Sequence, residues 1–208
     1  MDPTSDPVER LGVMGGTFDP IHLGHLIAAS EALHALRLDC VLFVPAGRPW
    51  QKGTFAQAED RYLMTVLAAG SHERFAVSRL ELDRGGPTYT VDTMEQLKDF
   101  YGDDVGLFFI VGSDALANLG TWHGLDRLRT IMELVAVSRP EWDDDRVGRD
   151  KSWPRITYLD TPEVEISSTD IRERVRAGRP IDYLVPSEVE DYIRRNGLYL
   201  DQREIKGA

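Results

Sequence analysis

The sequence predicts an α/β fold, a doubly wound parallel sheet with helices on both faces and a small helical piece near the C-terminus. Short apolar runs alternate with segments of helical periodicity along most of the 208 residues. The first apolar run ends in a glycine-rich turn, at the edge where such sheets bind ligands. The length fits one domain that can bury roughly 70% of its unfolded surface. We expect a single domain over residues 1–208, with tails at 1–9 and 201–208 and the helical piece at 180–200.

Each expected element corresponds to one apolar or amphipathic stretch. Strands are predicted at residues 11–14, 40–44, 75–82, 105–111, 134–137 and 156–159. Helices are predicted at residues 23–36, 58–69, 90–101, 113–119, 168–176 and 186–195. The polar and charged stretch 141–153 is expected to be a surface loop.

Composition excludes several classes of function. The net charge of −11 argues against general nucleic-acid binding, which depends on basic residues that neutralise phosphates. No apolar run approaches the length of a membrane span, and the N-terminal residues contain no secretory signal. Cys40 is the single cysteine, so no intrachain disulfide can form and a cytoplasmic location is expected. One cysteine and five dispersed histidines do not predict a zinc cage.

The most informative segment is GGTFDPIHLGH, residues 15–25. Glycines at a strand end let backbone N–H groups approach an anion, and a helix beginning at residues 20–21 would aim its free N–H groups at that anion. His22 and His25 would lie on one helical face, where both rings can donate to phosphate oxygens. The alternative is a pair of buried histidines satisfied by the backbone, but the glycines and the turn favour a phosphate site. Asp19 precedes a proline and is expected to form a turn that caps the helix.

A second segment, ISSTDIR at residues 166–172, lies far away in the sequence. Small hydroxyl residues open a predicted helix whose first turn carries Arg172. This helix end therefore offers N–H groups, hydroxyls and a guanidinium to a polyphosphate. Serine and threonine before acidic residues are also an ordinary capping signal, which is the alternative interpretation.

The first segment resembles the signature of the HIGH superfamily of nucleotidyltransferases, and its long form GGTFDPIHxGH is similar to that of nicotinate-mononucleotide adenylyltransferases. The second segment matches the ISSTxIR signature of the same family. The resemblance extends from about residue 11 to residue 172, with the motifs in the family's order. It implies a Rossmann-like fold, and it implies that ATP is bound by Gly15, Gly16, Thr17, Phe18, His22, His25, Gly112, Asp114, Arg139, Ile166, Ser168, Thr169 and Arg172.

Two of these positions follow other strands. Asp114 comes after the run 105–111, where a carboxylate can accept hydrogen bonds from ribose hydroxyls. The alternative is an acidic residue favoured only by the helix dipole. Arg139 lies in the motif SRP and would contact the nucleotide, with an ordinary surface charge as the alternative.

The loop PAGRPWQK, residues 45–52, resembles the family's P-x-x-x-P-x-x-K loop over the active site. Lys52 would bind and neutralise a substrate phosphate, with a solvated surface lysine as the alternative. Trp50 could cover the site or simply pack within the loop. The sequence does not decide between these two interpretations of Trp50.

The stretch TYTVDT, residues 88–93, resembles the family's substrate segment TYTxDT. A flat pyridine ring needs an aromatic wall, and its carboxylate needs hydrogen-bond donors. The resemblance assigns these tasks to Thr88, Tyr89, Thr90 and Trp122. For Trp122 the alternative is a tryptophan that only anchors the core.

The resemblance implies transfer of AMP from ATP to nicotinate mononucleotide, giving nicotinate adenine dinucleotide and pyrophosphate in NAD biosynthesis. The catalytic residues would be His22, His25, Lys52 and Arg172. Mg²⁺ would arrive with ATP, without a dedicated protein cage. ATP and nicotinate mononucleotide are the expected partners, together with a homo-oligomer but no nucleic acid or membrane. The alternatives are adenylyl transfer to phosphopantetheine or another phosphorylated acceptor, and a nucleotide sensor without catalysis. The combined TYTxDT and tryptophan motifs disfavour the first, and the intact histidines disfavour the second.

Overall fold

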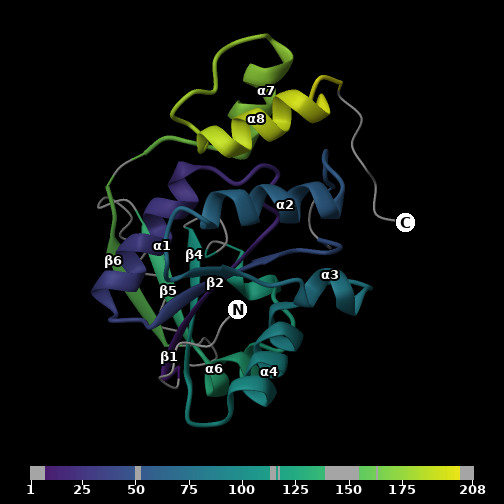
Figure 1. The fold of residues 1–208 in the computed structure, drawn as a ribbon. Helices are drawn as coiled ribbons and strands as arrows, with labels where there is room; N and C mark the ends of the chain where they lie inside the picture. Colours follow the sequence, from purple (N-terminus) through teal and green to yellow (C-terminus); the bar gives the residue numbers. More distant parts are fainter. Residues whose placement is uncertain are drawn as a thin grey trace. The chain divides into compact units, whose positions relative to one another are not determined.

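The computed structural model describes residues 8–49, 53–112, 116, 118–138, 155–162 and 164–201. A six-stranded sheet has the strand order β3-β2-β1-β4-β5-β6 (Figure 1). Its strands are β1 (Arg10–Gly16), β2 (Cys40–Pro45), β3 (Phe75–Val77), β4 (Gly106–Gly112), β5 (Glu133–Ser138) and β6 (Ile156–Asp160). The order reverses between β1 and β4, the switch point beyond which doubly wound folds bind ligands. This topology confirms the predicted α/β fold class.

The described helices reproduce most of the predicted ones. They are α1 (Leu23–Ala35), α2 (Ala58–Ala69), α3 (Leu80–Arg84), α4 (Thr90–Tyr101), α6 (Leu125–Ile131), α7 (Ser168–Arg176), α8 (Ser187–Asn196) and the 3-10 turn η1 (Leu119–Thr121). The predictions for α2, α4 and α7 had the same bounds, whereas α6 was not predicted. Most of the predicted helix 113–119 and the whole of the loop 141–153 lie outside the described residues. In the part of the chain that is described, no helix is long and apolar enough to cross a membrane.

Contacts divide the chain into two compact units, and each is described by itself. The first unit consists of Met1–Met14, Ala29–Leu42 and Tyr89–Thr161. The second unit consists of Gly15–Ala28, Phe43–Thr88 and Pro162–Ala208.

The first unit is built around the paired strands β1, β4, β5 and β6. These run parallel, with Gly12 opposite Phe108 and Phe109 opposite Leu134. Apolar side chains on these strands form the core, and Leu134 is fully buried. Helices α4 and α6 pack against each other, and Arg127 of α6 forms an ion pair with Glu95 of α4 at 2.7 Å.

The second unit is built around α2, which packs against both β3 and α8. Its core contains the fully or nearly fully buried side chains of Phe18, Ile21, Phe43, Met64, Ile171 and Val189. The hydroxyl of Tyr192 on α8 donates to Asp60 on α2 at 2.9 Å. Apolar packing and this polar contact together join the C-terminal helices to the rest of the unit.

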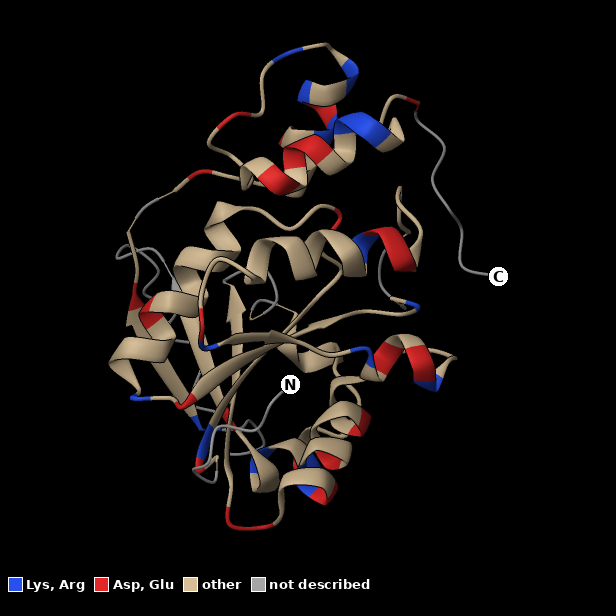
Figure 2. Cartoon of the chain, viewed as in Figure 1, with Lys and Arg blue, Asp and Glu red and all other residues tan. Residues whose placement is uncertain are grey.

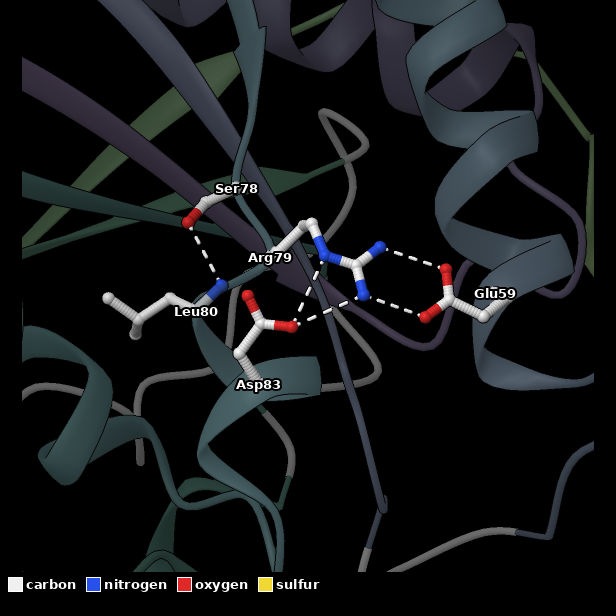
Figure 3. Close-up of polar contacts among 5 residues, drawn as sticks. All are labelled: Glu59, Ser78, Arg79, Leu80 and Asp83. Carbon is white, nitrogen blue, oxygen red and sulfur yellow. Dashed lines mark hydrogen bonds and ion pairs between the residues drawn. The ribbon is translucent and has the colours of Figure 1, made fainter.

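The predicted strand 75–82 is wrong beyond Val77, because the chain turns there into α3. The N–H group of Leu80 donates to the Oγ of Ser78 at 3.1 Å, which starts the turn. The guanidinium of Arg79 then donates to both carboxylate oxygens of Glu59 on α2, at 2.7 and 2.8 Å, and to Asp83 on α3 at 3.2 Å (Figure 3). The alternation of apolar and polar residues that predicted a strand at 75–82 is a local pattern. It carries no information about this contact with α2.

The loop after β2 approaches α3 too closely for a side chain at Gly47. A Cβ atom there would lie 2.3 Å from the carbonyl oxygen of Glu81, a backbone atom that cannot rotate away. We therefore expect Gly47→Ala to lower the free energy of unfolding by about 2 kcal/mol, or roughly 4–8 °C in Tm, measured by thermal denaturation.

Gly120→Ala is the matched control, because a Cβ atom at Gly120 meets no atom within 4 Å. Its Tm should stay close to that of the wild type. Equal losses in the two variants would contradict the close approach at Gly47.

Candidate active site

His22 and His25 form a stacked pair at the start of α1. The carbonyl of His22 accepts from the N–H group of His25 at 3.0 Å, and the ring centroids lie 3.7 Å apart at an interplanar angle of 30°. The N–H group of His22 donates to Nδ1 of His25 at 3.2 Å. Because Nδ1 of His25 is an acceptor, the ring proton is assigned to Nε2, which has no hydrogen-bond partner among the described residues.

Both imidazoles are neutral near pH 7. Burial lowers the pKa of His22 to about 4, and burial together with the neighbouring His22 lowers the pKa of His25 well below its ordinary value. Nδ1 of His22 is buried and has no hydrogen-bond partner among the described residues. An unpaired acceptor costs less free energy than an unpaired N–H group. We therefore assign the proton of His22 to Nε2 as well. The pair thus presents two neutral N–H donors.

The glycine-rich loop is shaped by close packing of its own side chains. Phe18 is 2% exposed, has a left-handed backbone with φ of 49°, and meets His25 edge to face at 5.1 Å. A Cβ atom at Gly16 would lie 2.8 Å from the ring of Phe18, and one at Gly24 would lie 3.1 Å from Nδ1 of His22. Phe18 therefore shapes the loop by packing beneath the histidines.

The start of α1 agrees with the predicted helix 23–36 but not with the start at residues 20–21 that the phosphate-site interpretation assumed. The helix begins at Leu23, whose N–H group already donates to the carbonyl of Leu184 at 2.9 Å. The N–H group of His22 is engaged as well, so this helix end does not offer the row of free donors expected from residues 20–21. The histidine rings, together with the N–H groups of another helix, are the donors here.

That other helix is α7. Ser167 caps it, accepting from the N–H group of Asp170 at 3.1 Å. The N–H groups of Ser168 and Thr169, in the first turn, have no partner among the described residues. A helix end with unpaired N–H groups and its positive dipole end is an anion-binding feature.

The start of α7 is bonded directly to the histidine segment. The hydroxyl of Ser168 donates to the carbonyl of Pro20, and Nη1 of Arg172 donates to the carbonyl of Asp19, both at 2.8 Å. The side chain of Ile166 lies 4.0 Å from the position of a Cβ atom at Gly24. The two predicted segments are therefore neighbours in the second unit, although about 150 residues separate them. Ser168 uses its hydroxyl for this connection, which leaves its N–H group for a ligand.

Arg172 is held in place but has no carboxylate partner within the described part of the chain. Its guanidinium lies over the ring of Phe55 at 4.3 Å, donates to the hydroxyl of Thr169 at 3.2 Å, and keeps a buried Nε without a partner. Burial lowers its pKa, and the nearby Asp19 opposes this shift. Figure 2 shows basic residues gathered on α7 and the turn after it, which include Arg172, Arg174, Arg176 and Arg179. A protein of net charge −11 thus has a local cation for an anionic ligand.

Asp19 has a structural role, as expected, but it does not cap α1. Its buried carboxylate accepts from the N–H groups of Phe55 at 2.7 Å and Ala56 at 3.1 Å, and from the hydroxyl of Tyr199 at 2.9 Å. All three donors come from segments distant in the sequence, so local turn chemistry could not identify them.

Arg61 on α2 was not predicted, yet it holds the loops after β1 and β2. It is 1% exposed and donates to the carbonyls of Thr17 at 2.8 Å and Gly47 at 3.2 Å. Burial lowers its pKa, and Asp19 is the largest opposing influence. The sequence contains a signal, because position 61 falls on the helix face that Met64 and Ala68 bury. A charged residue on such a face needs polar partners in the interior.

The residues predicted to bind the pyridine ring lie mainly in the first unit. Trp122 is half-buried and meets Phe109 of β4 edge to face at 5.6 Å. Tyr89 precedes α4, Thr90 is the first residue of that helix, and the ring of Tyr89 lies 4.1 Å from that of His123. His123 was not predicted, although it belongs to the same short loop as Trp122. Trp122, Tyr89 and His123 thus provide aromatic rings, and Thr90 lies at the start of α4.

Thr88, in the second unit, makes contacts that the sequence did not predict. Its N–H group and its hydroxyl both donate to the carbonyl of Arg48, at 3.2 and 3.0 Å. Thr88 thus joins the loop after β2 to the substrate segment, and its N–H group is already used. In this structure both of these donors of Thr88 are engaged within the chain, and its contact with substrate stays a prediction from the sequence.

Several predicted positions lie outside the described residues. These are Trp50, Lys52, Asp114 and Arg139. Gly112 is described and ends β4 with an exposed backbone.

Comparisons with known proteins agree with this fold and site. The pattern of the Cytidylyltransferase-like family matches residues 13–174. A curated protein of Corynebacterium kroppenstedtii, named probable nicotinate-nucleotide adenylyltransferase, is 50% identical over 204 residues, which cover 97% of this chain and 96% of that protein. One of the same name from Acidothermus cellulolyticus is 50% identical, with 91% of this chain and 94% of that protein covered. The chain belongs to the cytidylyltransferase-like family, and within it to the group of proteins named nicotinate-nucleotide adenylyltransferase.

Solved structures support the fold independently of close sequence similarity. The Plasmodium falciparum nicotinic acid mononucleotide adenylyltransferase complexed with NaAD has a TM-score of 0.72 at 18% identity, with 93% of this chain and 98% of that chain covered. At this identity the likeness concerns the fold.

The lowered pKa of His22 predicts how the free energy of unfolding depends on pH. The folded chain leaves His22 unprotonated down to about pH 4, whereas the unfolded chain takes up the proton near 6.5. The contribution of His22 to the free energy of unfolding is therefore complete above pH 6.5. It falls as the pH drops toward 4, by roughly 3 kcal/mol in total. In urea denaturation, the advantage of wild type over His22→Gln should be smaller at pH 4.5 than at pH 7.5 by about 2.5 kcal/mol.

His34→Gln removes an exposed histidine from the last turn of the same helix and is the control. The advantage of wild type over this variant should not shrink at pH 4.5. A constant difference for His22→Gln would mean that His22 is protonated normally in the folded protein.

Proposed function

We propose that this protein transfers AMP from ATP to nicotinate mononucleotide, giving nicotinate adenine dinucleotide and pyrophosphate. The observation that carries the proposal is the neutral, stacked pair of His22 and His25, together with Arg172, which bonds to the same segment at Asp19 and has no carboxylate partner among the described residues. Relatives at about 50% identity, named nicotinate-nucleotide adenylyltransferase, support this choice of acceptor.

The chemistry requires donors rather than a base. The phosphate of the acceptor is anionic near pH 7, so its oxygen can attack the α-phosphorus of ATP without losing a proton. A new P–O bond forms while the bond from the α-phosphorus to the bridging oxygen breaks, and pyrophosphate leaves with the electron pair. Nε2–H groups of His22 and His25 would stabilise the charge that develops on the phosphoryl oxygens.

Other residues would bind and align the two anions. Arg172, the N–H groups at the start of α7 and Lys52 would hold the triphosphate, while Asp114 and Arg139 would contact the nucleoside. Tyr89, Thr90 and Trp122 would bind the pyridine mononucleotide. Holding both reactants in line reduces the entropic part of the barrier.

A divalent ion, Mg²⁺, would enter with the triphosphate. The described residues contain no group of three or more His, Cys, Asp or Glu side chains placed to hold an ion. Cytoplasmic location and self-association stay predictions from the sequence.

Removal of either histidine tests the catalytic proposal. His22→Ala and His25→Ala should each lower kcat by about 100- to 1000-fold, because each removes a donor to the transition state. Release of pyrophosphate from ATP, Mg²⁺ and nicotinate mononucleotide measures this rate.

His34→Ala is the matched control on the same helix and should keep full activity. Circular dichroism should show that all three variants are folded. A folded His22→Ala or His25→Ala enzyme with near-normal kcat/KM would exclude that histidine from the reaction.

The acceptor is tested by comparing the two pyridine mononucleotides. Donors that bind a carboxylate are mismatched to an amide, which brings its own N–H group, so nicotinate should be preferred by at least about 100-fold in kcat/KM. Equal rates would refute the assigned acceptor specificity. A higher rate with phosphopantetheine would assign the protein to a different transfer reaction.

A further inference from the structure

Tyr199 lies beyond the residues that the family pattern matches, yet it reaches the base of the phosphate site. After α8 the chain reverses at Gly197, where φ is 60°, and the N–H group of Leu198 donates back to the carbonyl of Ile193 at 3.0 Å. This reversal turns Tyr199 inward, where it is 5% exposed and donates to Oδ1 of Asp19 at 2.9 Å.

The Tyr199 hydroxyl is a permanent donor. Burial, the charge of Asp19 and the hydrogen bond to it all raise the pKa of this phenol far above its ordinary value. Oδ1 of Asp19 also accepts from the N–H group of Ala56 at 3.1 Å. Without the phenol, the partners that the carboxylate keeps among the described residues are backbone N–H groups of the segment 55–56.

Asp19 supports Arg172 from two sides. Its carbonyl oxygen accepts from Nη1 of Arg172 at 2.8 Å, and its Oδ2 accepts from the N–H group of Phe55 at 2.7 Å. The ring of Phe55 in turn lies 4.3 Å from the guanidinium carbon of Arg172. A shift of the Asp19 carboxylate would therefore move both the hydrogen-bond acceptor and the aromatic ring that hold the cation.

We propose that Tyr199 is a positioning residue for the triphosphate, acting through Asp19 on Arg172. It touches no substrate itself. Its contribution is the placement of the cation and of the segment that leads to His22. The inference extends the proposed function, but its main readout is binding of ATP, which requires no acceptor.

The chain provides a closely matched control. The hydroxyl of Tyr192 on α8 also donates to a carboxylate, Oδ1 of Asp60, at the same 2.9 Å, and the pKa of this phenol is raised to about 12 by burial and by Asp60. Both tyrosines join the C-terminal piece to the remainder of the second unit. Only Tyr199 bonds to a residue that holds Arg172.

The experiment compares Tyr199→Phe with Tyr192→Phe, each of which removes one oxygen atom. Isothermal titration with ATP and Mg²⁺ should give a Kd raised by about tenfold for Tyr199→Phe and unchanged within about twofold for Tyr192→Phe. Both variants should lose some thermal stability. In steady-state assays Tyr199→Phe should raise the KM for ATP more than the KM for nicotinate mononucleotide.

Unchanged ATP affinity in Tyr199→Phe would overturn the proposal and leave a purely structural contact. An equal loss of affinity in both variants would also overturn it, because general loosening of the C-terminal piece would then be the cause. If the wild type binds ATP but does not react with nicotinate mononucleotide, the proposed function fails while the Kd values still decide the role of Tyr199.

A double variant tests the route through Asp19. If Tyr199 acts through that carboxylate, adding Tyr199→Phe to Asp19→Asn should change the Kd for ATP by less than about twofold. Multiplied effects would contradict the route. If Asp19→Asn does not fold, the two tyrosine variants alone decide the proposal.

Discussion

The buried carboxylate of Asp19 is the constraint on which the phosphate site depends. A carboxylate removed from water needs several donors, and here two N–H groups and one phenol supply them. All three donors are uncharged, so the charge of Arg172 is not consumed in a direct ion pair with Asp19. That guanidinium bonds instead to the carbonyl oxygen of the same residue. The arrangement places a cation next to the histidine segment while leaving its charge for an anionic ligand.

A second constraint concerns the charge of the two stacked histidines. Cations at both positions would repel each other, because their rings stack at 3.7 Å. Burial keeps them neutral, and the N–H group of His22 directs the proton of His25 to Nε2. Neutral donors in a partly desolvated site can still stabilise a developing charge, and they do so without the solvation cost of a buried imidazolium. In the proposed reaction, the positive charge that offsets the triphosphate would come from Arg172 on α7.

Local signals explain which parts of this structure could be predicted. Helices α2, α4 and α7 follow from their own periodicity and flanking residues, and their bounds agreed with the prediction. The proximity of His22 to Arg172 followed from a family resemblance, since no local pattern relates residues so far apart. The strand predicted at 75–82 was wrong beyond Val77, where Arg79 pairs with Glu59 on another helix at the turn into α3. Long-range ion pairs of this kind leave no periodic trace in a single sequence.

The same limit applies inside the motifs themselves. GGTFDPIHLGH contains the proposed ligand donors and the scaffold residues in adjacent positions, and the sequence does not separate them. Phe18 and Gly24 shape the packing around the histidines, whereas Asp19 connects the segment to residues 55–56 and to Tyr199. Thr88 and Ser168 likewise use their hydroxyls to join neighbouring loops. Since a polyphosphate site needs donors fixed to within fractions of an ångström, residues that hold the loops are under the same functional demand as those that touch the ligand. A motif therefore depends on other residues that hold it in the right geometry. Some of them, such as Tyr199, lie outside the motif itself.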